Sequence, residues 1–248
     1  MVLSSLRLSA AFAVTLGLLA GQPAFAGPGY MVTGFTTTGA NAPKLQAAWE
    51  KLNSAPIMKD RTSRALLMVN VADGDNPATH SFVVVYPSLA SVEAFRTKLY
   101  ADPAWAEWQN ALAQLGTVAD TTRYVTLRSW GDVSDADVVW ENFAFRVKDE
   151  AAFVAANERF QATAAGKAFP GQVHIVAVAA GGLSPVSHQI NVGWASDAEL
   201  EAWADKNANN PENLAFLAEL ERCSEFLGNS ILRTLSGGGA TLRSTIGR

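Results

Sequence analysis

The sequence is poor in several features that would point directly to a function. Its 248 residues include one cysteine, Cys223, so no disulfide can form within the chain, although an oxidising compartment would permit one. The formal net charge is only −4 and the basic residues are scattered, which argues against nucleic acid or anionic lipid as a partner. Helical spacing around Cys223 favours a small buried apolar residue over a reactive thiol, because no charged group that would lower its pKa is evident.

Signature motifs are missing as well. The sequence has no H-x-x-x-H, no C-x-x-C, no cluster of paired carboxylates and no nucleophile elbow, so zinc, haem-c, hydrolase and nucleotide chemistry lack direct support and no metal site is predicted. Asp132, Asp135 and Asp137 are spaced as in a calcium loop, but the glycine and glutamate of an EF-hand do not follow. We interpret residues 131–137 as a solvated linker.

The only long apolar run is at the N-terminus. Arg7 precedes an apolar segment over residues 8–19, and Ala24-Phe25-Ala26 matches a signal-peptidase cleavage site. A retained membrane anchor is the alternative, but the run is short of the roughly 20 residues that a span requires. We therefore expect residues 1–26 to be a signal peptide and the mature protein to be exported, periplasmic or secreted, with no stable membrane insertion after cleavage.

The rest of the chain repeats itself at an offset of 108 residues. Over residues 31–128 against 139–236, 19 of 98 positions are identical without a gap. The matches include prolines, glycines and turn residues as well as apolar positions, for example His80 with His188, Ser88 with Ser196, Gly74 with Gly182 and Pro103 with Pro211. Such fixed-period similarity indicates two copies of one structural unit.

Each copy has the same order of expected elements. A strand, a helix, two strands, a helix interrupted at a proline and a last strand follow one another, which is the βαββαβ ferredoxin-like arrangement. Ser88 and Ser196 stand where N-caps open the second helix of each copy. In the first copy the strands are expected at 30–36, 65–71, 80–86 and 122–130, and in the second at 138–146, 173–179, 188–194 and 230–235.

The segment Ser88-x-x-x-x-Glu93-Ala94-Phe95 followed by Ala101-Asp102-Pro103-x-Trp105 resembles the dimeric α/β-barrel superfamily, which includes antibiotic-biosynthesis-type monooxygenases, EthD-like proteins and stress-responsive barrel proteins. The resemblance implies an α+β fold in which two ferredoxin-like repeats pack sheet to sheet into one barrel. Here both would come from one chain: residues 27–130 and 138–236, with a flexible tail over 237–248. We expect a monomer with an intramolecular barrel, or a weak homo-oligomer.

Strand alternation assigns the faces of the second copy. Ile190, Val192 and Trp194 are the bulky apolar set of their strand and should pack under the helices, as should Phe143 and Phe145 of the first strand. The opposite faces should line the barrel interior. The same alternation places Asn70 of the first copy inside. The resulting ligand-binding candidates are Asn70, Trp140, Asn142, Arg146, Gln189 and Asn191.

The two copies differ on this interior face. Asn142, Gln189 and Asn191 stand where the first copy has Gly34, Ser81 and Val83. A few polar groups in an apolar cavity suit a small-molecule site, so the second copy is the expected location. The alternative is a structural role, in which these amides only form hydrogen bonds with one another or with the backbone at the barrel mouth.

His174 is the histidine without a repeat partner, and it is the candidate catalytic residue. It could act as a base or as a haem ligand, since imidazole titrates near neutral pH and binds metals. No cofactor is predicted, and haem has no supporting motif. His80 and His188 are equivalent by duplication and are interpreted as structural.

Two functions stay open. One is an exported small-molecule-binding or accessory protein; the other is a cofactor-independent monooxygenase-like enzyme, in which His174, Asn142 and Asn191 would position an aromatic or polyketide-like substrate. The first is favoured because no strong acid/base pair or nucleophile is evident.

Overall fold

The computed structural model describes residues 28–74, 76–131, 136–182 and 185–239. The predicted signal peptide, Asp132, Asp135 and residues 240–248 lie outside them. The first half contains β1 (Gly29–Thr37), α2 (Ala42–Asn53), the short 3-10 helix η1 (Pro56–Asp60), β2 (Arg64–Ala72), β3 (His80–Tyr86), α3 (Leu89–Tyr100), α4 (Pro103–Leu115) and β4 (Gly116–Trp130). The second half repeats this order with β5 (Val139–Val147), α5 (Glu150–Ala162), α6 (Ala164–Lys167), β6 (Val173–Gly181), β7 (His188–Trp194), α7 (Asp197–Asn207), α8 (Pro211–Cys223) and β8 (Ser224–Gly239).

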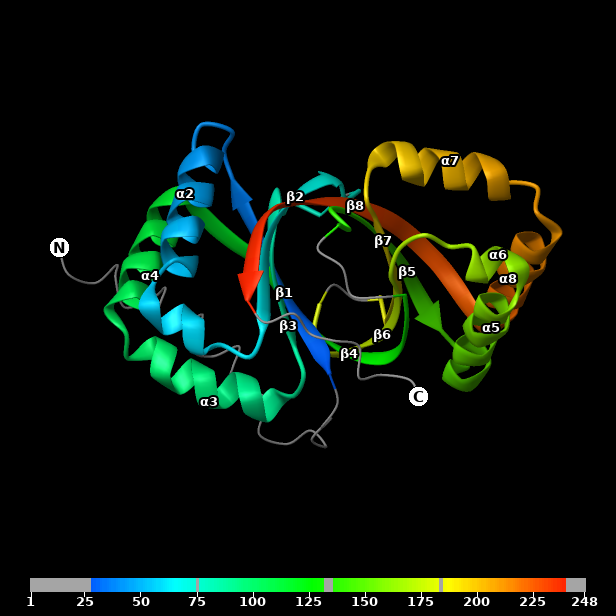
Figure 1. Ribbon diagram of the computed structural model, residues 1–248, viewed down its shortest axis with the longest axis horizontal. Coiled ribbons are helices and arrows are strands. Elements are labelled where there is room, and N and C mark those ends of the chain that lie inside the picture. The colour runs from blue at the N-terminus through cyan, green and yellow to red at the C-terminus, as the bar shows by residue number, and fades with distance from the viewer. Residues whose placement is uncertain (1–27, 75, 132–135, 183–184, 240–248) are drawn as a thin grey trace.

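The eight strands form one closed antiparallel barrel in the order β1-β3-β2-β8-β5-β7-β6-β4. Two seams join the halves, because β2 pairs with β8 and β4 pairs with β6. Helices α2, α3 and α4 lie on one side of the barrel and α5 to α8 on the other (Figure 1). The predicted α+β fold of two ferredoxin-like repeats closing into one intramolecular barrel is confirmed.

The helices begin where their capping residues predict. The Ser88 hydroxyl accepts a hydrogen bond from the Ser91 amide, and Ser196 accepts one from the Glu199 amide. After each interruption the helix restarts at a proline, with the side chain of the residue before it accepting a backbone N–H. Proline suits the first helical position because it has no N–H to leave unpaired.

Each half has its own apolar core between helices and sheet. Phe35, Leu45, Trp49, Leu67 and Trp108 are among the buried members in the first half. In the second half Ile190, Val192, Trp194 and Phe145 are buried in the core, with Phe143 packed against it, as strand alternation predicts. Packing the bulky residues outward under the helices leaves the alternate positions of each strand to face the lumen.

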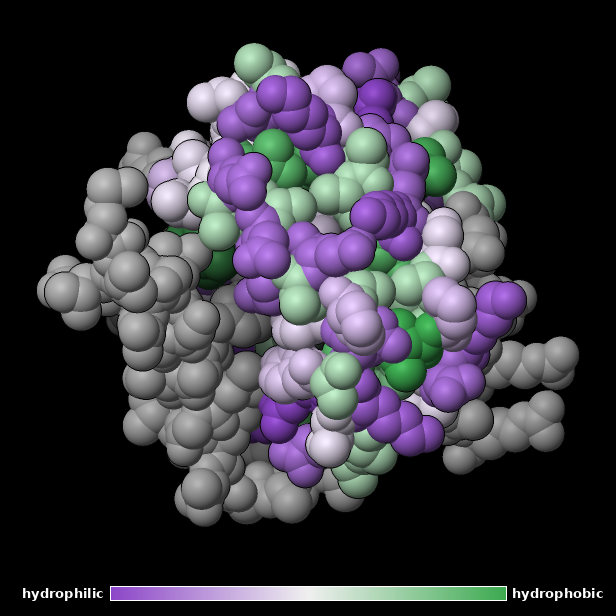
Figure 2. Space-filling model, turned by 90° about the vertical axis from the view of Figure 1, so that its left-hand side faces the viewer, coloured by the Kyte–Doolittle hydropathy of each residue, from purple (hydrophilic) through white to green (hydrophobic). Residues whose placement is uncertain are grey.

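The outer face over α2, α3 and α4 is mainly hydrophilic, with apolar residues scattered between polar ones (Figure 2). Within the described residues, no helix is long and apolar enough to cross a membrane. Cys223 is buried, and burial raises the pKa of its thiol, in line with the interpretation as a small apolar residue.

Two boundary predictions are wrong. Asp137 does not lie in a solvated linker, because it is only 7% exposed and its carboxylate accepts hydrogen bonds from the backbone and side-chain amides of Gln172. Gly237 to Gly239 do not belong to a flexible tail, because they extend β8 and pair with Leu66 to Arg64 of β2. Closing the barrel gives these glycines hydrogen-bonding partners from the other half, which a local pattern does not reveal.

Candidate functional site

The barrel lumen contains a cavity of about 480 Å³. This volume lies in the range of small-molecule sites in proteins. Its apolar wall comes from both halves: Val32, Leu66, Met68, Val83, Val85, Trp140 and Leu232. Both halves also supply polar lining groups, which include Tyr30, Arg64, Asp73, Ser81, Asp120, Thr122, Tyr124, Ser129, Asn142, His174, Gln189, Asn191 and Ser230.

Strand register places several of these polar residues in one row across the second half. Ser129 of β4 lies beside His174 of β6, His174 beside Asn191 of β7, Asn191 beside Asn142 of β5, and Asn142 beside Ser230 of β8. Neighbouring residues in adjacent strands point to the same face. The row therefore forms a continuous polar band on the cavity wall.

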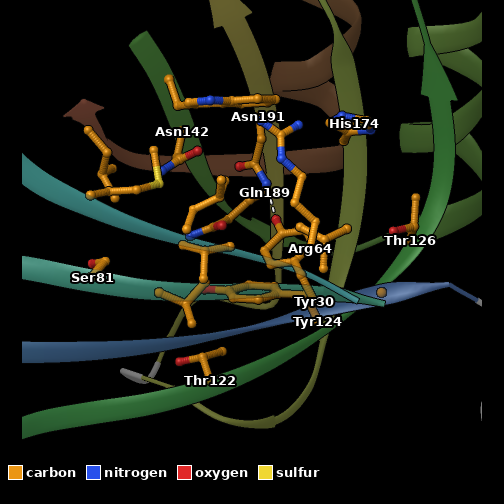
Figure 3. A pocket seen from close by; sticks show the side chains of 18 of the residues that line it. Tyr30, Arg64, Ser81, Thr122, Tyr124, Thr126, Asn142, His174, Gln189 and Asn191 are labelled. Atoms are coloured by element: carbon orange, nitrogen blue, oxygen red, sulfur yellow. Dashed lines mark hydrogen bonds between the residues drawn. The ribbon is translucent and has the colours of Figure 1, made fainter. Parts of the chain in front are cut away.

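Tyr30 connects this band to the first half of the barrel. The Asn191 side-chain amide donates a hydrogen bond to the Tyr30 hydroxyl across the lumen (Figure 3). The Tyr30 ring stacks on Tyr124 with centroids 4.8 Å apart. Burial raises the pKa of both phenols well above the usual value, so both stay protonated at neutral pH and can donate hydrogen bonds.

Two polar atoms of the cavity lining lack a partner. Asn191 is only 6% exposed, and its Nδ2 donates to the Tyr30 hydroxyl, whereas its Oδ1 accepts no hydrogen bond from any residue that the structure describes. The indole Nε1 of Trp140 is buried and donates to nothing among the described residues. An unsatisfied buried polar atom costs about 1–3 kcal/mol. One acceptor and one donor are thus left for a bound molecule to satisfy.

His174 lies next to Ser129, which ends the polar band. Its ring stacks on Trp140, with centroids 5.9 Å apart and planes 19° from parallel. Its Nδ1 lies 2.8 Å from Ser129 Oγ. Burial lowers the pKa of His174 to about 4, so the imidazole is neutral at pH 7. A general base works best with a pKa near the working pH, so this environment favours His174 as a hydrogen-bonding wall residue.

Two carboxyl groups lie at the opposite end of the cavity. Asp73 follows the end of β2, and Asp120 lies near the start of the antiparallel strand β4, so both belong to the same end of the barrel. Burial raises the pKa of Asp73 to about 6, and the neighbouring charge of Asp120 adds to the effect. Burial also raises the pKa of Asp120. We call Asp73 and Asp120 the acid end.

The structure places most of the predicted site residues around the cavity. Trp140, Asn142, His174, Gln189 and Asn191 all line it. Whether they bind a ligand stays a prediction.

Two predicted residues do not line this cavity. Asn70 donates to the Asp73 carboxylate at 2.9 Å and accepts from Ser81 at 2.9 Å, so it supports lining residues from behind. Arg146 is half exposed and pairs with Glu225 at 2.8 Å. A shift in the β5–β8 pairing between Ala144 and Phe145 precedes Arg146, near the end of β5, where the strand has left the cavity.

The first copy contributes more of the cavity lining than the comparison of the two copies predicts. Tyr30, Tyr124, Asp73 and Asp120 of the first half also line the cavity. The duplication contained a signal for them, because the same offset pairs Tyr30 with Val138 and Asp120 with Gly228. Polar residues that occur only in the first copy therefore indicate the cavity lining as well as those that occur only in the second copy.

The two equivalent histidines lie outside this lining. His188 Nε2 lies 3.0 Å from the Glu150 carboxylate, and its Nδ1 contacts Ser187. His80 Nδ1 lies 3.0 Å from Thr79 Oγ1. Both are buried at strand starts, in agreement with a structural role.

The lining does not fit a haem. A neutral His174 could coordinate iron, but a haem brings two carboxylates of its own. The described lining offers one cationic side chain, Arg64, and two acidic ones, Asp73 and Asp120. The second acid makes the cavity unfavourable for a dianion. No group of three potential metal-ligating side chains occurs among the described residues.

The closed barrel of two ferredoxin-like repeats with an open lumen defines the class: this is the dimeric α/β-barrel fold, built here from one chain. No protein-family model matches the sequence, and no curated protein matches it. Solved structures do match the fold over most of their length.

Three of these structures have similar coverage. A candidate monooxygenase from Lactobacillus acidophilus is 12% identical, with a TM-score of 0.60 over 86% of this chain and 96% of its own. A candidate monooxygenase from Fusobacterium nucleatum is 11% identical, with a TM-score of 0.59 over 88% of this chain and 98% of its own. An anthrone oxidase-like protein is 11% identical, with a TM-score of 0.57 over 90% of this chain and 100% of its own. At this identity the similarity shows the fold alone.

Proposed function

We propose that this is an exported protein that binds a small, mainly aromatic molecule inside the barrel. The observation that carries the proposal is the pair of unpartnered buried atoms, Asn191 Oδ1 and Trp140 Nε1, on the wall of a 480 Å³ cavity. A ligand that accepts a hydrogen bond from the indole N–H and donates one to the amide oxygen would satisfy both atoms. The aromatic rings of Tyr30, Tyr124 and Trp140 offer it stacking surfaces.

The test is a titration with 2-naphthol, a neutral aromatic alcohol, followed by calorimetry and by thermal unfolding. Saturable binding with a raised Tm is expected. Val83→Trp should abolish binding because the indole fills the lumen, whereas Val118→Trp, on a residue 45% exposed, should not affect it. Val32→Phe is a smaller filling change if Val83→Trp fails to fold. Absence of binding, or binding that both lumen variants leave intact, would contradict the proposal.

A second candidate is a cofactor-independent oxygenase, and Asp73 is the observation that favours it. With a pKa of about 6, its carboxylate could take a proton from a bound substrate near neutral pH, which His174 is poorly suited to do. The structures of the same fold include candidate monooxygenases and an anthrone oxidase-like protein.

Anthrone is a suitable probe for this activity. Its oxidation by dioxygen to anthraquinone removes two hydrogens, adds one oxygen atom and releases the other as water. Catalysis should consume one dioxygen per anthraquinone formed and should fall at least tenfold in Asp73→Asn. Equal rates with and without the protein would exclude this candidate for anthrone while leaving the binding function standing.

A further inference from the structure

The acid end is distinctive because its two carboxyls face the lumen. Register aligns Asp120 of β4 with Gly34 of β1, and Gly34 with Ser81 of β3. Asp120 Oδ1 occupies the space that a Cβ at Gly34 would need, at 2.2 Å from the ideal position, so glycine at this point admits the carboxyl. Asp73 reaches the same end from the turn after β2.

Neither carboxyl has a cationic partner in the part of the chain that the structure describes. Among the described residues, Asp73 and Asp120 take part in no ion pair. Their contacts are neutral: Asn70 donates to Asp73 at 2.9 Å, and the Thr122 hydroxyl approaches Asp120 at 3.4 Å. Arg64 is the one lysine or arginine of the described lining, and it lies at the start of β2, the strand that Asp73 follows. Partly buried carboxylates without a cation are costly, and a bound cation would offset that cost.

The remaining lining suggests a ligand with two different ends. Beyond the acid end lie the stacked rings of Tyr30 and Tyr124, the stacked pair Trp140 and His174, and the unpartnered Oδ1 of Asn191. Asp120 and Tyr124 are four residues apart on one strand and so point to the same face. The charges of Asp120 and Asp73 help to raise the pKa of Tyr124, so both carboxyls lie within electrostatic reach of that phenol. A molecule with an aromatic body and a cationic group on a short chain matches this division of the lining.

We propose that the ligand is an arylalkylamine, bound with its protonated amine between Asp73 and Asp120 and its ring among the tyrosines. This inference rests on the proposed binding function and adds the charge of the ligand to it. An ammonium also suits the geometry because it donates up to three hydrogen bonds, which two carboxylates can accept together.

The experiment compares three probes that share a 4-hydroxyphenyl ring. Tyramine carries an ammonium group, 4-ethylphenol carries none, and 3-(4-hydroxyphenyl)propionate carries a carboxylate. By calorimetry at pH 7.5 we expect tyramine to bind at least tenfold more tightly than 4-ethylphenol, and the propionate to bind most weakly. Asp73→Asn/Asp120→Asn should remove the advantage of tyramine and leave the affinity for 4-ethylphenol within about twofold.

An exposed acid supplies the matched control, since Asp205→Asn on α7 should change none of the three affinities. Lowering the pH from 7.5 to 5 should weaken tyramine binding at least fivefold, because Asp73 becomes protonated while the amine keeps its charge. The other titratable groups near Asp73 are Asp120, Tyr124 and, in the adjoining surface groove, His80. The 4-ethylphenol affinity should change little over this range.

The outcomes separate the two proposals. If 4-ethylphenol binds but tyramine gains nothing, or if the double variant keeps the tyramine advantage, the amine inference is wrong and the binding function stands. If 2-naphthol and all three probes fail to bind, both are wrong.

Discussion

The side-chain amide of Asn191 on β7 donates to the hydroxyl of Tyr30 on β1, across the lumen of the barrel. The two residues are 161 positions apart and belong to different halves. This hydrogen bond therefore links the two repeats directly across the cavity. It also fixes the amide so that its Oδ1 is the atom left for a ligand.

Removing the Tyr30 hydroxyl should destabilise the barrel. Tyr30→Phe leaves the buried Asn191 amide without its acceptor, which we expect to lower the free energy of unfolding by about 1–2 kcal/mol. Adding Asn191→Leu should recover part of this loss, because the orphaned amide is then gone. Urea unfolding of both single variants and the double variant measures the coupling. Tyr100→Phe, on a residue 43% exposed, is the control, and additive effects would show that the hydrogen bond does not matter.

Asp73 should destabilise the protein at neutral pH. Its folded-state pKa of about 6 lies above the ordinary value of 3.8, so the folded chain binds the proton more tightly than the unfolded one. The favourable effect of protonation is fully present below pH 3.8 and is lost as the pH rises through 6. Asp73→Asn should therefore raise the free energy of unfolding by about 1 kcal/mol at pH 7.5, after allowance for solvent screening, and by much less at pH 4. An equal gain at both pH values would contradict this account.

Through His174, acidification should lower the free energy of unfolding, which is the opposite of its effect through Asp73. Its folded-state pKa of about 4 lies below 6.5, so the unfolded chain takes up the proton first and stability is lost as the pH falls from 6.5 towards 4. At pH 5 the penalty is about 2 kcal/mol relative to pH 7. In His174→Gln the drop in unfolding free energy between pH 7 and pH 5 should be smaller by that amount. NMR titration of the imidazole gives an independent check, and a midpoint near 6.5 would contradict the prediction.

A single chain should be the folded unit in solution. Both sheet seams, β2 with β8 and β4 with β6, lie within one chain, so no partner is needed to close the barrel. Light scattering after size exclusion should give the mass of one chain at micromolar concentration, with at most weak association. Obligate dimers whose dissociation coincides with unfolding would contradict this prediction.

The interior face was predictable where the strands alternate cleanly. Gln189 and Asn191 alternate with Ile190 and Val192, and the large apolar residues had to be buried under the helices, so the amides could only face the lumen. Arg146 follows the same alternation but lies beyond the register shift, where the barrel no longer encloses its side chain. Strand alternation therefore determines which face of the sheet a side chain lies on. It does not determine how far along the barrel axis that side chain lies.

The sequence by itself determined the duplication, the βαββαβ order and the resemblance to the dimeric α/β barrels. These depend on periodicity, capping residues and local spacing, which are properties of neighbouring residues. Only the tertiary structure decided that Tyr30 meets Asn191, that Asp73 and Asp120 share one end of the lumen, and that Gly237 to Gly239 close the barrel. Those contacts arise from the order in which strands from two halves pair, and no local pattern in the chain encodes the partner of a strand more than one hundred residues away.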